Sequence, residues 1–426
     1  MAGRIDSGDE PTGPVEPPTP FRWVVLAGVW LVYASFGMAT VSLAPLVEPI
    51  VRDLGISHGT MGLVFGAWQM VFILSAVPLG ALVDGIGARR ALLIASAMIA
   101  ASGLLRSTAP DTATLWFAVA VFGLGGPIVS IGAPKLISGW FHGPERGFAM
   151  GIYATGPSLG SITALSTTNS ILMPTFDGDW RAILQLWALV AALVGCVWLA
   201  IAVQPQMRKS DAGLTTRKRT PQTTVVLELL RFPSVQILLA MAVGIFTFNH
   251  GLNNWLPEVL RGHGLSPAAA GYWSTIPTIV GIFGALFIPR LATPSRRYWL
   301  LIGLCIAAGL ASLMLRAQSG PVLVAGLFMQ GIARSSLTTI MLLALVEMPG
   351  IGEARAGVAS GLFFSAGEVG GACGPLLLGL LHDWSGGFGL GLSTLSVISL
   401  ALFFGALRMQ ALARGPKQSS GRPQPL

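Results

Sequence analysis

A single arginine within a long apolar segment is the residue of this sequence with the clearest chemical meaning. In the stretch FMQGIARSSLTTIML, Arg334 is the only charged residue in about 25, and a charge at the centre of a bilayer costs about 3 kcal/mol on insertion scales. Gln330 and Thr338 stand four residues to either side, so on a helix the three form one polar stripe. A guanidinium on such a stripe can bind an anionic or strongly polar ligand through two parallel hydrogen bonds.

The carboxyl group of Glu368 is expected at a similar depth in the next apolar segment, and it leaves two roles open for Arg334. In one, the two residues form a buried ion pair that holds two helices together. In the other, Arg334 binds the ligand, and the pair opens when the ligand arrives. Glu368 is also a candidate proton carrier, because burial favours its protonated form and a nearby cation favours its ionised form.

Other polar residues in apolar segments extend this candidate site. The stretch TFNHGLNNW places Asn249 with Asn253, and His250 with Asn254, in two adjacent rows at i, i+4 spacing. Such a concentration of polar groups is costly in lipid, so we expect a polar ligand or a water-filled cavity beside it. The remaining candidates for ligand contact are Tyr33, Thr40 and Lys135. Lys135 has an alternative role, because a lysine near a helix end can extend its amine to the membrane surface.

The composition predicts that membrane-spanning helices position these residues. Hydrophobic residues make up 53% of the 426 and charged residues only 10%, and the mean hydropathy is +0.71, whereas soluble proteins carry about 25% charge. Apolar runs of roughly 20 residues suffice to cross a bilayer, where backbone groups must bond within their own helix. The sequence therefore predicts an all-α integral membrane fold with twelve transmembrane helices, at about 22–47, 60–83, 91–108, 113–139, 147–172, 181–203, 234–256, 268–289, 298–316, 321–347, 356–381 and 388–408.

Polar segments divide the chain into two halves of six predicted helices. We expect a disordered cytoplasmic tail (1–20), an N-terminal six-helix bundle (21–203), a basic cytoplasmic linker (204–232), a C-terminal six-helix bundle (233–408) and a second disordered cytoplasmic tail (409–426). The net charge is +8, but most arginines and lysines fall in segments on one side of the predicted membrane. This positive-inside bias indicates a multi-pass protein of the cell (inner) membrane with both termini in the cytoplasm, and not a nucleic-acid-binding protein.

The two halves are related in sequence. GFAMGIYATGPSLGS (147–161) aligns without gaps with GVASGLFFSAGEVGG (357–371), so that Gly151 matches Gly361 and Gly160 matches Gly370. Repeated halves are typical of transporters whose binding site lies between the halves near the middle of the membrane.

The loop GALVDGIGARRALL, between the second and third predicted helices, resembles the signature loop of the major facilitator superfamily. The resemblance rests on Gly80, Asp84, Gly87, Arg89 and Arg90. It implies that this loop latches the cytoplasmic ends of the two halves together in the outward-facing state, with Asp84 near the start of the eleventh helix. It also implies that the first, fourth, seventh and tenth helices line a central cavity, which would place Arg334 there. The alternative is a loop whose arginines only set the orientation of the chain.

Shorter stretches resemble parts of that superfamily. TGPSLGS is similar to part of its antiporter motif through Gly156, Pro157 and Gly160, and the alternative role of these residues is helix packing and bending. GLLRSTAP, GAPKLISGWF and NNWLPEVLRGHGLSPAAAG resemble the bacterial cyanate and nitroimidazole transporter branch. The implied function is secondary active transport, by symport or antiport, of a small polar or anionic solute through alternating access. The alternative is a proton-coupled exporter of drugs or secondary metabolites on the same fold.

Several other functions find no support in the sequence. There is no G-x-x-x-x-G-K-[ST] loop for ATP and no H-E-x-x-H motif, so we expect neither an enzyme nor a bound cofactor or metal. The expected partners are the lipid bilayer and a small solute, with protons as the candidate coupling ion, no nucleic acid, and a monomeric protein. A sensor on the same fold that does not transport would be distinguished by a flux assay.

Overall fold

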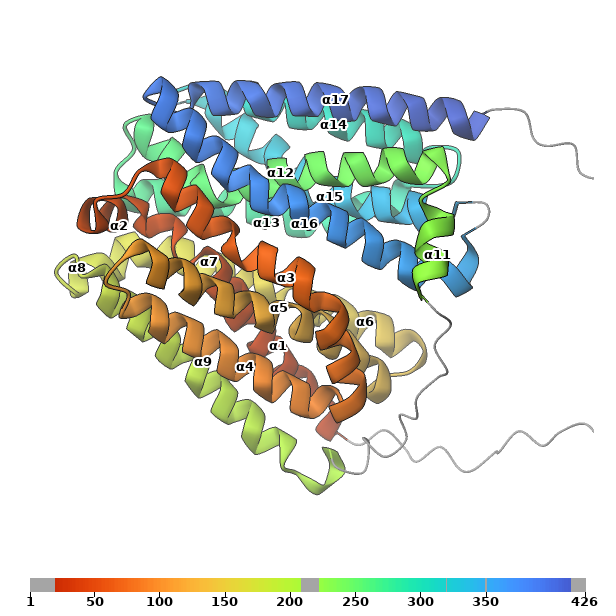
Figure 1. Cartoon of the computed structure of the whole chain (residues 1–426), viewed down its shortest axis with the longest axis horizontal. Helices are drawn as coiled ribbons and strands as arrows, with labels where there is room; N and C mark the ends of the chain where they lie inside the picture. Colours follow the sequence, from red (N-terminus) through yellow and green to blue (C-terminus); the bar gives the residue numbers. More distant parts are fainter. Residues whose placement is uncertain (1–19, 208–221, 319, 349–350, 415–426) are drawn as a thin grey trace, which may run out of the picture.

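The computed structural model describes residues 20–207, 222–318, 320–348 and 351–414, and throughout these ranges the chain is helical with short connections (Figure 1). The first half contains α1 (Phe21–Val41), η1 (Ala44–Leu46), α2 (Val47–Leu54), α3 (His58–Ile86), α4 (Ala88–Ser107), α5 (Thr112–Trp140), α6 (Gly143–Ala154), α7 (Gly156–Thr167), η2 (Thr168–Leu172), α8 (Met173–Thr175) and α9 (Trp180–Ala202). The second half contains α11 (Gln222–Leu229), α12 (Pro233–Gly262), α13 (Pro267–Leu291), α14 (Arg297–Met314), α15 (Pro321–Val346), α16 (Gly352–Ser385) and α17 (Gly389–Arg414).

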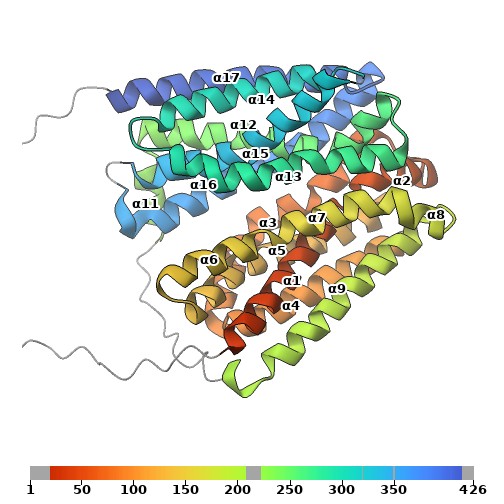
Figure 2. The same cartoon turned by 180° about the vertical axis from the view of Figure 1, so that it is seen from behind.

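Within the described ranges, eleven helices are long and apolar enough to cross a membrane. The fifth predicted helix is instead divided into α6 and α7, of 12 residues each, which follow one another along one side of the first bundle (Figure 2). Together they extend about 36 Å at 1.5 Å per residue, so the pair supplies the twelfth crossing. The all-α, twelve-helix fold predicted from hydropathy is confirmed.

Two predicted boundaries differ from the structure in detail. Helix α17 continues to Arg414, beyond the predicted end at residue 408, and the added turn packs against the protein through Met409 and Gln410, both buried. The predicted linker contains α11. Of the two predicted tails, at 1–20 and 409–426, residues 1–19 and 415–426 lie outside the described residues, as does the centre of the linker, at 208–221.

The two bundles repeat the same close helix contact. A Cβ atom at Gly160 of α7 would lie 1.9 Å from the carbonyl oxygen of Ala34 on α1, and one at Gly370 of α16 would lie 2.0 Å from that of Val243 on α12. Only glycine allows backbones to approach so closely. These are the two glycines that the alignment of the halves pairs, so the internal repeat is also a repeat of packing.

The bundles meet at one end and diverge at the other (Figures 1 and 2). We call the end at which Phe21, Ala202 and Arg414 lie the linker end, and the opposite end the far end. At the far end α3 packs closely on α16, where a Cβ atom at Gly62 would lie 2.4 Å from the carbonyl oxygen of Pro375, and α7 packs on α13. Glu48 of α2 forms an ion pair with Arg261 of α12 across this interface. The far end is therefore closed.

Candidate functional site

Arg334 faces a cavity between the two bundles. The cavity has a volume of about 240 Å³. Its walls come from α6 and α7 of the first bundle and from α13 and α15 of the second. The polar groups in these walls belong to Arg334, Thr155, Ser158, Thr278 and Ser335, and the other lining residues are small or apolar: Gly151, Ala154, Pro277, Gly281, Ile282, Ala285 and Leu286. A mostly apolar cavity with one fixed cation suits a ligand that carries an anionic or electron-rich polar group on a small apolar body.

One hydrogen bond holds the guanidinium of Arg334. Its Nη1 donates to Oδ1 of Asn253 on α12 at 2.9 Å. A guanidinium has five N–H donors, and among the described residues this is the one side-chain partner that Arg334 has. The remaining donors are therefore available to a ligand in the cavity.

Of the neighbouring asparagines, Asn249 joins the same helix pair, whereas Asn254 bonds within α12. Nδ2 of Asn249 donates to the carbonyl oxygen of Arg334 at 3.3 Å, and Nδ2 of Asn254 donates to the carbonyl oxygen of His250 at 2.9 Å. The side-chain oxygen of Asn249 and both polar atoms of Gln330 are buried, with no hydrogen-bond partner in the described part of the chain. Of the predicted polar stripe on α15, Arg334 thus lines the cavity, whereas Gln330 is 1% exposed.

A second polar cluster crosses the bundle interface through His250. The ring Nδ1 of His250 is 3.2 Å from Nε2 of Gln69 on α3, and its Nε2 is 4.0 Å from Oε2 of Glu368 on α16. Gly371 makes room for this cluster, because a Cβ atom there would lie 2.7 Å from Oε2 of Glu368. Both ring nitrogens of one histidine therefore face polar groups, an arrangement through which a proton can pass.

The expected ion pair between Arg334 and Glu368 is not formed in this structure. In the described residues, Arg334 bonds to Asn253, and the basic group nearest to Glu368 is the His250 imidazole. The two residues were expected at similar depth, but depth does not fix the rotation of their helices. The carboxyl oxygen Oε2 of Glu368 is buried without a hydrogen-bond partner.

The other three ligand candidates have local contacts. The ring of Tyr33 stacks on that of Tyr153 with centroids 5.4 Å apart, and the Thr40 hydroxyl donates to the carbonyl oxygen of Phe36 at 2.8 Å. Lys135 forms an ion pair with Asp84, with Nζ 2.9 Å from Oδ1. None of the three belongs to the walls of the Arg334 cavity.

The signature loop at the linker end contacts its own bundle. Asp84 pairs with Lys135 of α5. Arg89, which is 9% exposed, donates to the carbonyl oxygen of Ala202 at 2.8 Å, and its own carbonyl oxygen accepts from Nε1 of Trp198. Gly87, at φ +84°, allows the turn between α3 and α4. Arg90 is exposed, and Gly80 lies against Ile131 of α5.

The antiporter-like stretch stands at the break between α6 and α7. Helix α6 ends at Ala154, and α7 begins at Gly156 with Pro157 in its first turn. Thr155 at this junction accepts a hydrogen bond from Nε1 of Trp30 at 3.0 Å, while Gly156 and Gly160 lie directly against α1. The break gives the cavity wall its Thr155 and Ser158 side chains.

Sequence reasoning missed several residues that take part in these clusters. Gln69 was the only amide in its predicted helix, which is a usable signal, but its histidine partner depends on how α3 packs against α12. Arg106 of α4 lies within the predicted helix 91–108 but was not among the candidate residues, and it is 3% exposed. It donates to the carbonyl oxygen of Ala39 at 2.9 Å and to the hydroxyl of Ser42 at 3.2 Å, and it lies over the ring of Phe122.

Comparison with known proteins agrees with this fold. The family model described as Major Facilitator Superfamily matches residues 29–375. The 2-nitroimidazole transporter of Escherichia coli is 24% identical over 89% of this chain and 94% of its own length. The nitrite extrusion protein of Bacillus subtilis is 24% identical over 86% of this chain and 89% of its own. The chain also superposes on a bacterial homologue of the human lysosomal transporter Spinster in an inward-facing, unoccupied conformation, with TM-score 0.74 and 17% identity over 93% of this chain and 98% of that one.

The chain belongs to the Major Facilitator Superfamily, because the family model covers most of its length. It is a multi-pass membrane protein and a secondary transporter of small solutes. The resemblance found in the signature loop is thereby confirmed at the level of the superfamily.

Proposed function

We propose that this transporter moves a small anionic or strongly polar solute, that the solute binds in the cavity between the bundles, and that Arg334 is its anchor. The observation that carries the proposal is a guanidinium that lines the interbundle cavity with one side-chain hydrogen bond among the described residues. A charged group in a membrane protein usually marks a functional pathway. The cavity volume of about 240 Å³ is below the usual range for drug-sized ligands, about 300–1,000 Å³, which favours a small solute over the alternative of bulky drugs.

Alternating access is supported by the difference between the two ends of the molecule. Contacts between the bundles extend from the far end, where Glu48 meets Arg261, toward the middle of the helices, where Gln69 meets His250. The two bundles, residues 21–203 and 233–408, would move as the two bodies of the cycle. We place the linker end in the cytoplasm of a bacterial cell, because the positive-inside rule favours the side richer in arginine, which makes this conformation inward-facing.

We further propose that Glu368 and His250 carry a coupling proton. Glu368 is buried at the interface with an oxygen that lacks a hydrogen bond, and His250 lies 4.0 Å away. Opening the far end would part α3 from α16 and so expose this cluster to the other side of the membrane. A carboxyl group that changes sides with the solute can link proton movement to solute movement.

The substrate class is tested by solute flux into proteoliposomes that contain the purified protein. Nitrite and 2-nitroimidazole are informative probes, because they match the solutes in the names of two relatives; a cationic solute of similar size serves as the comparison. Flux of an anionic or nitro solute that disappears in Arg334→Ala supports the proposal. Equal flux in the wild type and in Arg334→Ala, at equal protein incorporation, would remove Arg334 from the site.

A further inference from the structure

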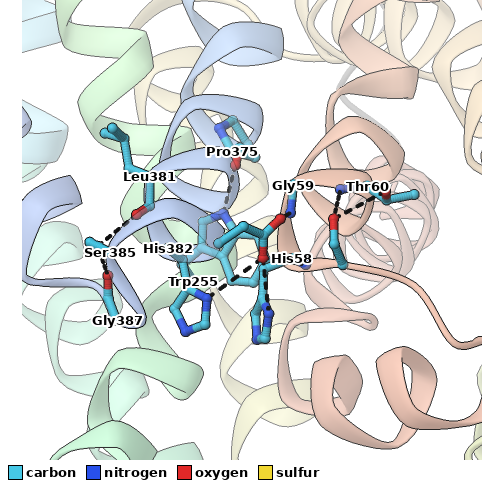
Figure 3. Close-up of polar contacts among 11 residues, drawn as sticks. His58, Gly59, Thr60, Trp255, Pro375, Leu381, His382, Ser385 and Gly387 are labelled. Atoms are coloured by element: carbon cyan, nitrogen blue, oxygen red, sulfur yellow. Dashed lines mark hydrogen bonds and ion pairs between the residues drawn. The ribbon is translucent and has the colours of Figure 1, made fainter.

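Two histidines that are distant in sequence meet at the far end of the bundle interface. His58 begins α3 of the first bundle, and His382 lies near the end of α16 of the second. Their ring centroids are 3.8 Å apart, and Figure 3 shows the two rings side by side. Asp383 completes the group, with its Oδ1 3.6 Å from Nδ1 of His58 and 3.8 Å from Nδ1 of His382.

The carboxylate of Asp383 is held in place from the other bundle. Its Oδ1 accepts the backbone N–H of His58 at 3.0 Å, and its Oδ2 accepts that of Gly59 at 2.7 Å. These are the first N–H groups of α3, which have no partner within their own helix and favour a negative charge. The contact orients the carboxylate, and further lone pairs remain on its oxygens for a cation.

We propose that His58, His382 and Asp383 form a site for a divalent transition metal, of which Zn²⁺ is the best fit, and that the bound metal bridges the two bundles while the far end is closed. The three ligand atoms lie within 4.8 Å of one another. Zinc bonds to imidazole and carboxylate of about 2.0–2.2 Å place neighbouring tetrahedral ligands about 3.3–3.5 Å apart. The two distances to Asp383 need only small side-chain movements to meet this geometry.

The chemistry and access of the cluster suit zinc better than calcium or magnesium. Two imidazoles and one carboxylate are typical zinc ligands, and three protein ligands leave one position for water. Ca²⁺ and Mg²⁺ prefer sets composed of oxygen ligands. Nδ1 of His382 has no hydrogen-bond partner in the described chain. The two histidines also line a far-end cavity of about 730 Å³, which provides an entry path for the ion.

This site requires residues of both bundles, which gives it a mechanical consequence. His58 belongs to the first bundle, whereas His382 and Asp383 belong to the second. Separation of α3 from α16 would pull the ligands apart, so metal binding and far-end opening exclude each other. An occupied site therefore stabilises the conformation described here.

The test is zinc binding by the full chain in detergent at pH 7.5, measured by titration calorimetry and by the shift of the melting temperature, with Mg²⁺ as the comparison ion. We expect one Zn²⁺ per chain and a higher melting temperature with zinc alone. His58→Ala and His382→Ala should each weaken binding about tenfold or more. His263→Ala is the matched control, because His263 lines the same cavity but lies outside the ligand group.

A second variant separates the metal site from helix capping. Asp383→Asn keeps a side-chain oxygen that can accept a backbone N–H of α3 but lacks the anionic charge. Because its amide nitrogen cannot accept the second of the two N–H groups, we expect the metal-free variant to melt somewhat lower than the wild type, and zinc to raise its melting temperature by much less than it does in the wild type. Absence of zinc binding by the wild type, or binding equal in wild type, His58→Ala and His382→Ala, would overturn the proposal.

Discussion

At the scale of single residues, the groups that hold Arg334 in position leave most of its hydrogen-bond donors available to a ligand. Asn253 accepts a hydrogen bond from one N–H group of the Arg334 guanidinium, and Asn249 donates a hydrogen bond to the backbone carbonyl oxygen of Arg334. The helices α12 and α15 therefore hold the guanidinium at the wall of the cavity without neutralising it. An uncompensated cation in such a place is costly unless an anion or water reaches it.

The first prediction concerns the shape of that cation. Arg334→Lys keeps the charge but loses the bidentate geometry of the guanidinium. Since hydrogen bonds to charged groups contribute about 1.5–3 kcal/mol, we expect binding of the transported solute to weaken about tenfold or more, and Arg334→Ala to weaken it further. The measurement is substrate-dependent stabilisation of the purified protein. Arg408→Ala, at an exposed position of α17, should leave it unchanged, and a lysine variant as good as the wild type would contradict a bidentate contact.

The second prediction concerns coupling. Glu368→Gln retains the size of the side chain and removes its ability to ionise. If Glu368 carries the coupling proton, the variant should lose acceleration of transport by a pH gradient but still exchange solute for solute across the membrane. Both rates are measurable in the same proteoliposomes. Retained dependence on the pH gradient would assign the proton to another group.

At the scale of the helix, glycine contacts decide which helices can lie backbone to backbone. Gly160 and Gly370 take the same place in the two halves, each against the first helix of its own bundle. Gly151 and Gly361 are also paired by the alignment, but a Cβ atom at either would meet nothing within 4 Å. The aligned glycines therefore have different functions within one repeat.

This difference gives a third prediction. Gly370→Ala would place a Cβ atom 2.0 Å from the carbonyl oxygen of Val243, which forces α16 away from α12 and should destabilise the protein by about 1–3 kcal/mol, as overpacking does. Gly361→Ala, in open space on the same helix, should be neutral or stabilising, because alanine favours helix by about 1 kcal/mol over glycine. Thermal unfolding in one detergent compares the two. Equal melting temperatures would refute the close contact.

The helices themselves were predictable from the sequence, while the contacts between them were only partly so. Apolar runs define the crossings because the bilayer fixes their length, and the spacing of Gln330 and Arg334 predicted a polar stripe. The choice of Asn253 over Glu368 as the partner of Arg334 depends on helix rotation, and the cluster of Gln69, His250 and Glu368 depends on the space left by Gly371. The hydropathy of a single helix predicts neither the partner of Arg334 nor this cluster. The motif around Pro157 indicated a bend in the helix, but the sequence did not predict how that bend shapes the cavity wall.

At the scale of the whole molecule, a small number of polar contacts bias which end is closed. The ion pair between Glu48 and Arg261 joins the bundles, while Arg52 binds the same carboxylate from within the first bundle at 2.5 Å. The two arginines thus bind the same carboxylate, one across the interface and one within a single helix. The contact across the interface is present only while the far end is closed.

The fourth prediction follows from this pair. Arg261→Gln should shift the population toward the open far end by a factor of about 1.4 to 5, since a partly exposed ion pair contributes about 0.2–1 kcal/mol. Arg52→Gln should have a smaller effect on the same equilibrium. Spin labels at Thr108 and Gln318, exposed residues at the far end of the two bundles, report the distance after replacement of the three native cysteines. Identical distance distributions in both variants would show that the pair does not bias the conformation.

The buried position of Arg106 has a consequence for biosynthesis. Arg106 lies in the last turn of α4, at the far end. Its partners are Ala39 in the last turn of α1, Ser42 directly after α1, and Phe122 of α5. When α4 leaves the translocon, placing Arg106 in lipid costs free energy. The groups that offset this cost are all present only after α5 has been synthesised. The first helices of the chain should therefore enter the membrane as a group, with α4 retained beside the translocon until α5 arrives.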